Sequence, residues 1–278
     1  MHVRALIFDT TDTLWQHTLP HNAERERAAV ARAVAVLLDR WGVACVDATA
    51  LAAALIGTIH EVEREARRSL LAPDYLLHVE RVAAAAGLVL SPDDLDLLWR
   101  ASYVDPERLG RQTFPDTVAT LRWAREAGYL LAVIDDSPHA AHFLATELAG
   151  AGLAGLFDAV AGAHCSGWLR PHPRAFLDVL TRLGVEPSEA IVIGDSLTTD
   201  IHGARLLGMR TVWKRNGRRL PAGQRPAVMP TYQIDDLCEL RDLPELRRER
   251  PSFAESRLLP SETPDPTTGT ITRADRYD

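Results

Sequence analysis

Short apolar runs alternate with longer segments of helical periodicity through most of this chain. VRALIF (Val3–Phe8), YLLAVI (Tyr129–Ile134) and AIVI (Ala190–Ile193) are too continuous for half-exposed strands and therefore predict buried parallel strands. A further strand is expected at Thr211–Trp213. Helices are predicted between the strands, at Pro115–Ala127, Pro138–Leu148, Pro173–Leu183 and, more briefly, from Asp200 to Leu207. This alternation predicts an α/β fold built on a parallel sheet.

Local signals set the expected ends of these helices. Ser137 is predicted to cap the second helix, with Pro138 at its first position. Gly128 and Gly184 are predicted to end the first and the third, because glycine readily adopts the left-handed conformation that closes a helix.

The stretch between Trp15 and Gln112 has a different pattern, with little clustering of β-branched residues. Four helices are predicted there, at Ala23–Trp41, Thr49–Arg68, Pro73–Ala86 and Pro92–Tyr103. They suggest a helical lid inserted after the first strand. The expected division is a core of residues 1–15 and 113–248, a cap of residues 16–112, and a disordered tail of residues 249–278 that is rich in proline, threonine and charge.

The composition narrows the class of protein. The formal charge of −7 offers no basic field for nucleic acid, and no apolar run approaches the roughly 20 residues of a membrane helix. The chain enters its first strand without a charged and apolar leader, and Cys45, Cys165 and Cys238 are few and widely spaced. We therefore expect a cytoplasmic globular protein with reduced thiols, whose oligomeric state is left open.

Polar clusters follow the predicted strands. They are IFDTTDTL after the first, AVIDDSP after the second and IGDSLTTD after the third, with LRPHP before the third core helix. Together with the inserted helices, these motifs resemble the haloacid dehalogenase-like (HAD) hydrolase superfamily with a helical cap of the first type, from residue 3 to about residue 245. The resemblance implies a doubly wound, Rossmann-like core with an inserted α-helical cap, whose loops meet in one pocket beneath the cap.

Asp9 ends the first predicted strand, where a carboxylate could either accept backbone hydrogen bonds from the next turn or serve a function. The resemblance implies that Asp9 attacks phosphorus and forms an aspartyl-phosphate. It also implies catalytic or substrate contacts from five further residues, Thr13, Asp135, Asp136, Ser137 and Arg170. The expected partner is a small phosphorylated metabolite.

Asp195 and Asp200 stand five residues apart in a predicted strand-to-helix loop that can face the same site as Asp9. Three clustered carboxylates repel one another strongly unless a cation is bound or one of them stays protonated. Oxygen ligands of this kind suit Mg²⁺, and the backbone carbonyl of Thr11 could complete the set. The alternative for Asp200 is that it only caps the following helix.

Several positions depart from the pattern of the family. Thr11 stands in place of its acid/base aspartate, and a hydroxyl cannot shuttle a proton near neutral pH, a function worth ~10²–10⁴ in rate. Asp135 stands in place of a phosphate-binding hydroxyl, and its carboxylate would repel a phosphoryl group unless protonated or paired with a metal. Arg170 replaces a lysine and is expected either to bind an anion or to form a surface salt bridge. Asp12 replaces a glycine and is interpreted as a turn residue.

These departures leave two functions open. By the resemblance, a phosphonate-cleaving relative would need a cap lysine, but Lys214 is the only lysine of the chain, and a phosphosugar mutase would need the aspartate that Thr11 replaces. The haloacid dehalogenases of the superfamily dispense with magnesium and seldom carry an intact GDxxxxD motif, so GDSLTTD disfavours carbon–halogen cleavage. The sequence therefore predicts a Mg²⁺-dependent phosphatase of small phosphomonoesters. Threonine in this position resembles the cation-pumping ATPases, whose aspartyl-phosphate persists, so turnover is expected to be slow. The alternative is a catalytically degenerate protein that acts as a binding or regulatory module.

Overall fold

The core of the molecule is a six-stranded parallel sheet. The computed structural model describes residues 2–16, 23–218 and 228–247, so the predicted tail lies outside the described residues. The strands follow the order β3-β2-β1-β4-β5-β6, and every neighbouring pair is parallel. Their bounds are β1 (Ala5–Asp9), β2 (Leu130–Ile134), β3 (Ala159–Ala161), β4 (Ala190–Gly194), β5 (Arg210–Lys214) and β6 (Tyr232–Ile234). The predicted doubly wound α/β fold is confirmed.

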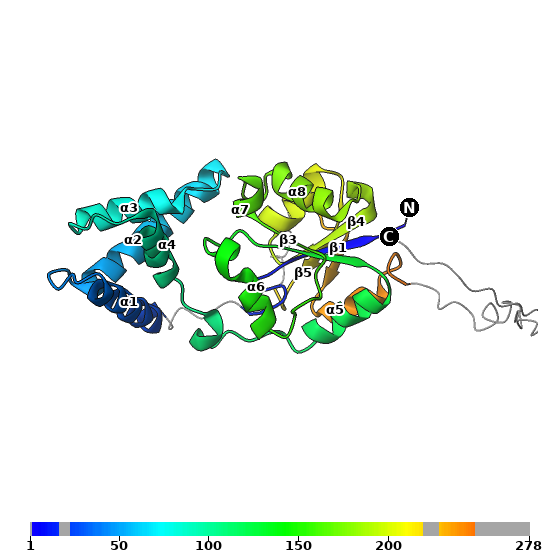
Figure 1. The fold of residues 1–278 in the computed structure, drawn as a ribbon. Helices are drawn as coiled ribbons and strands as arrows, with labels where there is room; N and C mark the ends of the chain where they lie inside the picture. The colour runs from blue at the N-terminus through cyan, green and yellow to red at the C-terminus, as the bar shows by residue number, and fades with distance from the viewer. Residues whose placement is uncertain (1, 17–22, 219–227, 248–278) are drawn as a thin grey trace, which may run out of the picture.

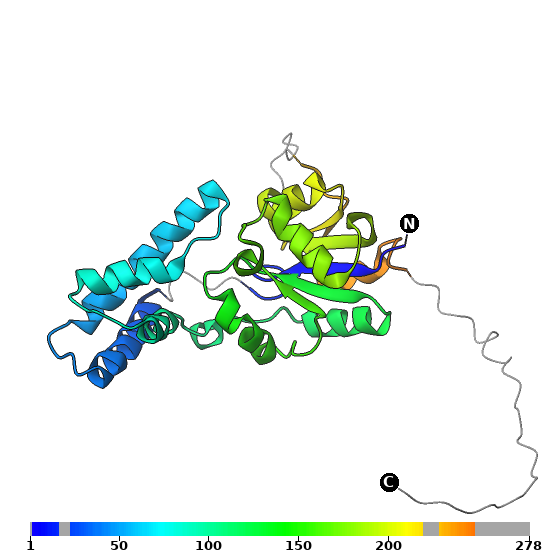
Figure 2. The same cartoon turned by 45° about the horizontal axis from the view of Figure 1, so that its top comes forward.

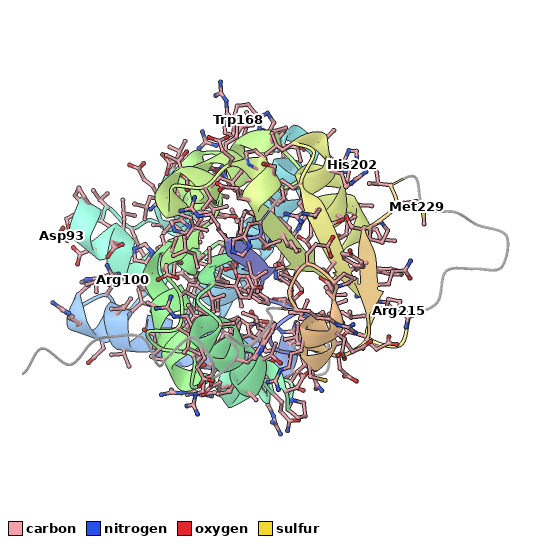
Figure 3. The ribbon with its side chains drawn as sticks, turned by 90° about the vertical axis from the view of Figure 1, so that its right-hand side faces the viewer. Asp93, Arg100, Trp168, His202, Arg215 and Met229 are labelled. Carbon is pink, nitrogen blue, oxygen red and sulfur yellow. The ribbon has the colours of Figure 1, made fainter. Side chains whose placement is uncertain are left out.

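Helices cover both faces of this sheet, as the view in Figure 3 shows around the central strand β1. They are α5 (Thr117–Glu126), α6 (Ala140–Gly150), α7 (Ala163–Ser166), α8 (Pro173–Leu183) and α9 (His202–Leu206). In β1, Leu6 and Phe8 belong to one hydrophobic cluster with α5 and α6, whereas Ala5 and Ile7 belong to a second cluster with α8 and α9. Both faces of the strand are buried, which explains why its sequence is a continuous apolar run.

Helix α6 begins later than the sequence predicts. The helix starts at Ala140, and the residue in the N-cap position is His139, which makes no side-chain capping bond. The backbone N–H of Ser137 instead donates to Asp135 Oδ1 at 2.6 Å, which folds the segment into a turn before the helix. The predicted capping role of Ser137 is therefore wrong. The prediction for α8 is confirmed, because the helix begins at Pro173 and Gly184 closes it with a φ of +62°.

A group of four helices lies beside the sheet, at the left of Figure 1. Their bounds are α1 (Ala23–Arg40), α2 (Ala48–Ser69), α3 (Tyr75–Ala85) and α4 (Pro92–Ala101), and a 3₁₀ helix, η2 (Pro106–Leu109), follows. The helices share a hydrophobic cluster of their own that includes Val30, Leu55 and Trp99. No helix in the described part of the chain is long and apolar enough to cross a membrane.

The helical group faces the carboxyl ends of the strands (Figures 1 and 2). Its two connections to the core run side by side, because the N–H of Gln16 donates to the carbonyl of Gln112 at 2.8 Å. The loop between α2 and α3 also contacts the core, where the N–H of Leu169 donates to the carbonyl of Leu70 at 2.9 Å. The helices are thus held directly over the edge of the sheet where the polar loops lie.

Candidate active site

The register of the strands brings the polar loops together. Asp9 is aligned with Ile134 of β2, and Phe8 with Ile193 of β4. Asp135 and Asp195 therefore follow their strands at the same edge as Asp9. This edge lies at the carboxyl ends of β2, β1 and β4, where ligands bind in doubly wound sheets.

Both carboxylate oxygens of Asp9 are hydrogen-bonded. Arg170 Nη1 donates to Oδ1 at 2.8 Å, and the hydroxyl of Thr13 donates to Oδ2 at 3.0 Å. Thr13 is fully buried, so in this conformation its side chain orients Asp9. Burial raises the pKa of Asp9 well above its ordinary value, and the Asp200 carboxylate raises it further. The ionised form of Asp9 therefore needs more positive charge than Arg170 supplies.

Asp200 lies inside a short π-helix, η4 (Leu197–Ile201), immediately after β4. Its Oδ2 accepts the N–H of Ser196 at 3.0 Å, and its Oδ1 accepts Arg170 Nη1 at 2.6 Å. A Cβ atom on Gly194 would come within 2.3 Å of this carboxylate, so glycine is needed for the close approach. The capping residue of the turn is Ser196, and Asp200 is therefore not a helix N-cap.

Asp195 is only partly buried and has a different partner. Arg218 Nη2 donates to Asp195 Oδ2 at 2.7 Å, and Trp213 Nε1 donates to its backbone carbonyl at 2.8 Å. Burial raises the pKa of Asp195, while the hydrogen bond from Arg218 lowers it. Asp195 is thus paired with Arg218, whereas Asp9 and Asp200 are paired with Arg170.

The three predicted metal ligands lie together. One carboxylate oxygen each from Asp9, Asp195 and Asp200 can be chosen so that all three atoms lie within 4.8 Å of one another. Burial raises the pKa of Asp200 as it does for the other two. Such a set of oxygen donors, in which each charge is poorly compensated, is chemically suited to a small, hard dication.

Arg170 is the positive centre of the site. Besides Asp9 and Asp200, it pairs through Nε with Asp136 Oδ2 at 2.8 Å, and its side chain is only 9% exposed. Burial alone would lower the pKa of Arg170, but the Asp136, Asp200 and Asp9 carboxylates together raise it above its ordinary value. The expected alternative of a surface salt bridge is therefore wrong, because Arg170 forms a buried ion cluster.

The formal charges of this cluster do not balance. Four carboxylates, those of Asp9, Asp136, Asp195 and Asp200, are joined to two guanidinium groups, those of Arg170 and Arg218. Four negative and two positive charges leave a formal charge of −2. A single divalent cation would neutralise the cluster, which supports the fit of Mg²⁺ to these residues.

Asp135 uses both of its oxygens locally. The hydroxyl of Thr10 donates to Oδ2, and the N–H of Ser137 donates to Oδ1. The carboxylate therefore pins the loop after β2 to the loop after β1. Ser137 also lines the adjoining cavity.

Thr11 is exposed at the mouth of the site, between the buried residues Thr10 and Thr13. Asp12 adopts a φ of +59°, so its interpretation as a turn residue is confirmed. Thr11 also lines the cavity between the helical group and the sheet. Thr11 thus faces the space that a bound molecule would occupy.

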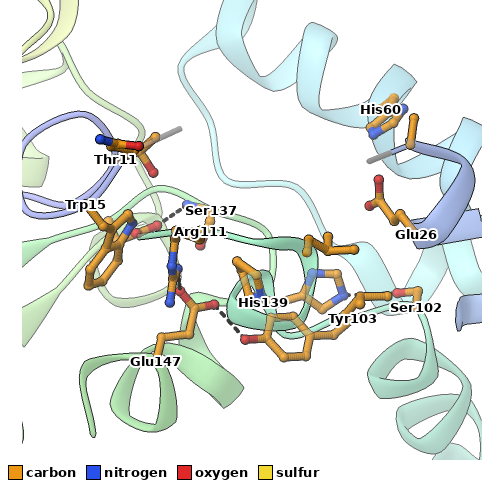
Figure 4. Close-up of a pocket in the computed structure, with 16 residues that line it drawn as sticks. Thr11, Trp15, Glu26, His60, Ser102, Tyr103, Arg111, Ser137, His139 and Glu147 are labelled. Carbon is orange, nitrogen blue, oxygen red and sulfur yellow. Dashed lines mark hydrogen bonds and ion pairs between the residues drawn. The ribbon is translucent and has the colours of Figure 1, made fainter. Parts of the chain in front are cut away.

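A cavity of about 410 Å³ lies between the helical group and the sheet (Figure 4). Its core side includes Thr11, Asp135 and Ser137, and its far side includes Glu26 of α1 and His60 of α2. Arg111 and Glu147 form its floor and pair at 2.5 Å. The volume suits a small molecule held between the two parts of the chain.

The site also contains four residues that no sequence motif marked as site residues, namely Arg111, Glu147, Thr10 and Arg218. Arg111 and Glu147 lie 36 residues apart in unrelated segments, and Arg218 lies 23 residues after its partner Asp195. No fixed spacing or motif marks such pairs. Of these four residues, only Thr10 lies in a predicted site motif, IFDTTDTL.

The fold and the site together define an α/β protein with an acidic site at the carboxyl ends of its strands, beneath a helical insertion. Residues 3–208 match the family of haloacid dehalogenase-like hydrolases. The chain belongs to this family, as the motifs predicted.

Curated relatives that match the chain include phosphatases. The phosphoserine phosphatase of Thermus thermophilus is 35% identical over 134 residues, which are 48% of this chain and 52% of the relative. The glyceraldehyde 3-phosphate phosphatase of Methanopyrus kandleri is 32% identical over 143 residues, 51% of this chain and 60% of the relative. The chain thus spans about half the length of the curated relatives it matches. The HAD phosphatase from Thermococcus onnurineus is similar in structure, with a TM-score of 0.52 and 27% identity over 86% of this chain and 97% of that one.

Proposed function

We propose that this protein hydrolyses a small phosphomonoester through an aspartyl-phosphate on Asp9. The observation that carries the proposal is the cluster of Asp9, Asp195 and Asp200 at the carboxyl ends of the strands, with oxygens within 4.8 Å of one another and a formal charge that a dication would balance. If Asp9 only accepted backbone hydrogen bonds from the next turn, it would not need two further carboxylates beside it. The phosphatase names of the relatives support the same class of reaction.

In this mechanism an oxygen of Asp9 attacks phosphorus, and the alkoxide leaves with the electron pair of the broken P–O bond and takes up a proton from solvent water. Thr13 and Arg170 fix the carboxylate, so that little reorientation is needed before attack. Arg170 also supplies positive charge next to the phosphoryl oxygens. Water then attacks the phosphorus of the aspartyl-phosphate, which releases inorganic phosphate and restores the carboxylate.

Asp9, Asp195 and Asp200 would hold Mg²⁺, and the carbonyl of Thr11 would add a fourth oxygen. The ion would supply Lewis-acid stabilisation of the charge on the phosphoryl oxygens. Burial raises the pKa of each of the three carboxylates, so their ionised forms are unfavourable without additional positive charge. A bound dication would supply that charge.

Proton transfer is the weak step of this site. Thr11 faces the cavity but has a hydroxyl in place of a carboxylate. His139 also lines the cavity, but burial lowers its pKa to about 4, and it is therefore neutral at pH 7. We expect slow departure of poor leaving groups and a phosphoenzyme that persists.

The helices of residues 16–112 would act as the cap of this site. They face the carboxyl ends of the strands and supply Glu26 and His60 to the cavity (Figure 4). The substrate would be a small phosphorylated metabolite. Cytoplasmic residence is part of the proposal, because Cys45, Cys165 and Cys238 are free thiols.

A binding or regulatory module is the second candidate function. The observation in its favour is that both oxygens of Asp9 already carry hydrogen bonds, which lowers the nucleophilicity of the carboxylate. In that case the cluster would bind a cation and an anion without turnover.

A panel of phosphate esters separates the two functions. Wild-type protein and Asp9→Asn are assayed with an aryl phosphate and with small alkyl phosphates, each with and without millimolar Mg²⁺. Mg²⁺-dependent turnover that Asp9→Asn abolishes supports the phosphatase. Binding of Mg²⁺ without turnover of any ester supports the module.

A further inference from the structure

The loop between α2 and α3 pairs with the backbone segment that follows α7 in the core. The N–H of Leu169 donates to the carbonyl of Leu70 at 2.9 Å. A second bond runs the other way, from the N–H of Ala72 to the carbonyl of Gly167 at 3.0 Å. The residues between these bonds face each other as an antiparallel bridge. The two paired stretches, residues 70–72 and residues 167–169, are called the clasp.

Apolar packing surrounds the clasp. Ala66 of α2, Ala163 of α7 and Leu169 form one buried cluster, and Ala72 packs against it. Figure 1 shows the corresponding end of α2 close to α7. Leu169 is only 5% exposed, so its N–H finds its acceptor in the helical group and not in water. Movement of the helical group away from the core would break both backbone bonds and expose these apolar side chains.

Arg170 directly follows the clasp. Its backbone N–H donates to Asp136 Oδ2 at 3.0 Å, and its Nε donates to the same oxygen at 2.8 Å. Two successive N–H groups, those of Leu169 and Arg170, are therefore bound to the helical group and to Asp136. Only two soft dihedral angles separate neighbouring peptide groups, so a displacement of Leu169 would reorient Arg170.

We propose that the clasp positions Arg170, so that the guanidinium group lies against Asp9 only while the helical group is docked on the core. This inference rests on the proposed function and adds a role for the cap, because docking of the cap completes the catalytic site. The clasp residues are positioning residues. They act through Arg170, whose Nη1 contacts Asp9 Oδ1 at 2.8 Å.

The variant Ala72→Pro tests the coupling, because proline has no N–H to donate to Gly167. Ala72→Ser keeps this N–H and is the matched control. In the full-length, ¹⁵N-labelled protein, the Nε–H signal of Arg170 is identified by its loss in Arg170→Lys and reports on the contact with Asp136. We expect this N–H to exchange with solvent about tenfold faster in Ala72→Pro than in the wild type, and at the wild-type rate in Ala72→Ser.

A reversible disulfide should rescue the variant. Leu71 and Trp168 are an antiparallel pair without hydrogen bonds between them, and the Cα atoms of such pairs lie about 4.5 Å apart, within the range of a disulfide. Leu71→Cys and Trp168→Cys are combined with Ala72→Pro in a chain whose three free cysteines are replaced by serine. Oxidation should return the exchange of Arg170 Nε–H to the wild-type rate, and reduction should raise it again.

Two further measurements keep the test decisive. Backbone amides of β1, followed in the same samples, should exchange at unchanged rates, which separates opening of the clasp from global unfolding. If Ala72→Pro fails to fold, the two cysteines are introduced without it, and the oxidised protein should exchange Arg170 Nε–H more slowly than the reduced protein.

The outcomes separate the clasp from the proposed function. Equal exchange of Arg170 Nε–H in the wild type, in Ala72→Pro and in both redox forms would overturn the coupling and leave the phosphatase standing. Exchange that follows the clasp, in a protein that turns over no phosphate ester, would support the coupling and contradict the proposed function.

Discussion

The two sides of the cavity are stabilised in opposite ways. On the sheet side, the carboxylate edge (Asp9, Asp136, Asp195, Asp200 with Arg170 and Arg218) holds charges that do not balance, and all but the half-exposed Arg218 are largely buried. On the helical side, the aromatic contact (Trp99, Tyr103, His139 and Phe143) joins α4 to α6 through neutral rings. Its stacked pairs have centroid distances of 4.0 Å for Trp99 with His139 and 3.9 Å for Tyr103 with Phe143.

The difference shows what each side requires. The carboxylate edge is held by the strand register, and its uncompensated charges are unfavourable for the folded protein, so a bound cation is expected to stabilise it. The aromatic contact needs no ligand, because stacking and the 3.0 Å approach of Ser102 Oγ to His139 Nε2 are complete within the chain. Substitutions of charged residues and the addition of Mg²⁺ should therefore change the stability of the carboxylate edge. A fall in pH that protonates His139 should instead destabilise the aromatic contact.

Loss of Arg170 should have the largest effect. Arg170→Met leaves Asp9, Asp136 and Asp200 buried without their common partner, and we expect the free energy of unfolding to fall by about 3–5 kcal/mol. Urea denaturation measures it. The matched control is Arg182→Met, which removes an exposed pair with Asp178 and should change stability by less than about 0.5 kcal/mol. Equal effects of the two substitutions on the free energy of unfolding would show that the buried carboxylates do not depend on Arg170 for stability.

The departures Thr11 and Asp135 should act together on turnover. Thr11→Asp alone gives little, Asp135→Thr alone improves apparent affinity, and the double variant should exceed their sum because both side chains line the same cavity. The gain could reach about 10²-fold in kcat/KM, the low end of acid/base catalysis. Steady-state kinetics with an aryl phosphate measures this coupling. A double variant that folds and binds Mg²⁺ but does not exceed either single variant would show that other features limit the site.

Magnesium should stabilise the protein through the carboxylate edge. At roughly thirty times its Kd, Mg²⁺ should add about 2 kcal/mol to the free energy of unfolding, seen as a rise in the melting temperature. Asp195→Asn should abolish this rise, whereas Asp178→Asn, outside the cluster, should retain it. If the melting curve of the wild type does not respond to Mg²⁺, the metal site is absent.

The aromatic contact should respond to pH. Burial lowers the pKa of His139 to about 4, below its ordinary value of 6.5, so the unfolded chain binds a proton that the folded chain rejects. The contribution of His139 is therefore complete above about pH 6.5 and is lost as the pH falls toward 4, by at most about 1.4 kcal/mol per pH unit. Denaturation of wild type and His139→Phe at pH 7.0 and 5.5 measures the difference. An identical pH dependence in both proteins would refute a neutral, buried His139.

The strands and most helix ends could be predicted from the sequence. Continuous apolar runs and glycine or proline signals placed β1, β2, β4, β5 and α8 to within a few residues, since burial on both faces leaves a clear pattern. β3 and β6 have three residues each, too few for any periodicity. The start of α6 was misplaced because Asp135, not Ser137, organises the turn before it.

Some residues of the candidate site could also be predicted from the sequence, and others could not. Asp9, Asp195 and Asp200 were predicted to lie together because Asp9 ends one strand and the other two lie in the loop after another, and the register places them at one edge. The threefold pairing of Arg170 and the pair of Arg111 with Glu147 could not be predicted, because side-chain packing between distant segments leaves no spacing to read. For the same reason, whether a residue of the family pattern is free to react or already engaged appears only in three dimensions.

The most direct test of the central claim is to trap the phosphoenzyme. Wild-type protein is mixed with an aryl phosphate and Mg²⁺, quenched in acid, and analysed by intact mass and peptide mapping. The account predicts one added phosphoryl group on the peptide that contains Asp9, its persistence because Thr11 cannot activate water, and its loss in Asp9→Asn. Turnover of the ester without any such adduct, or an adduct that maps to another residue, would contradict it.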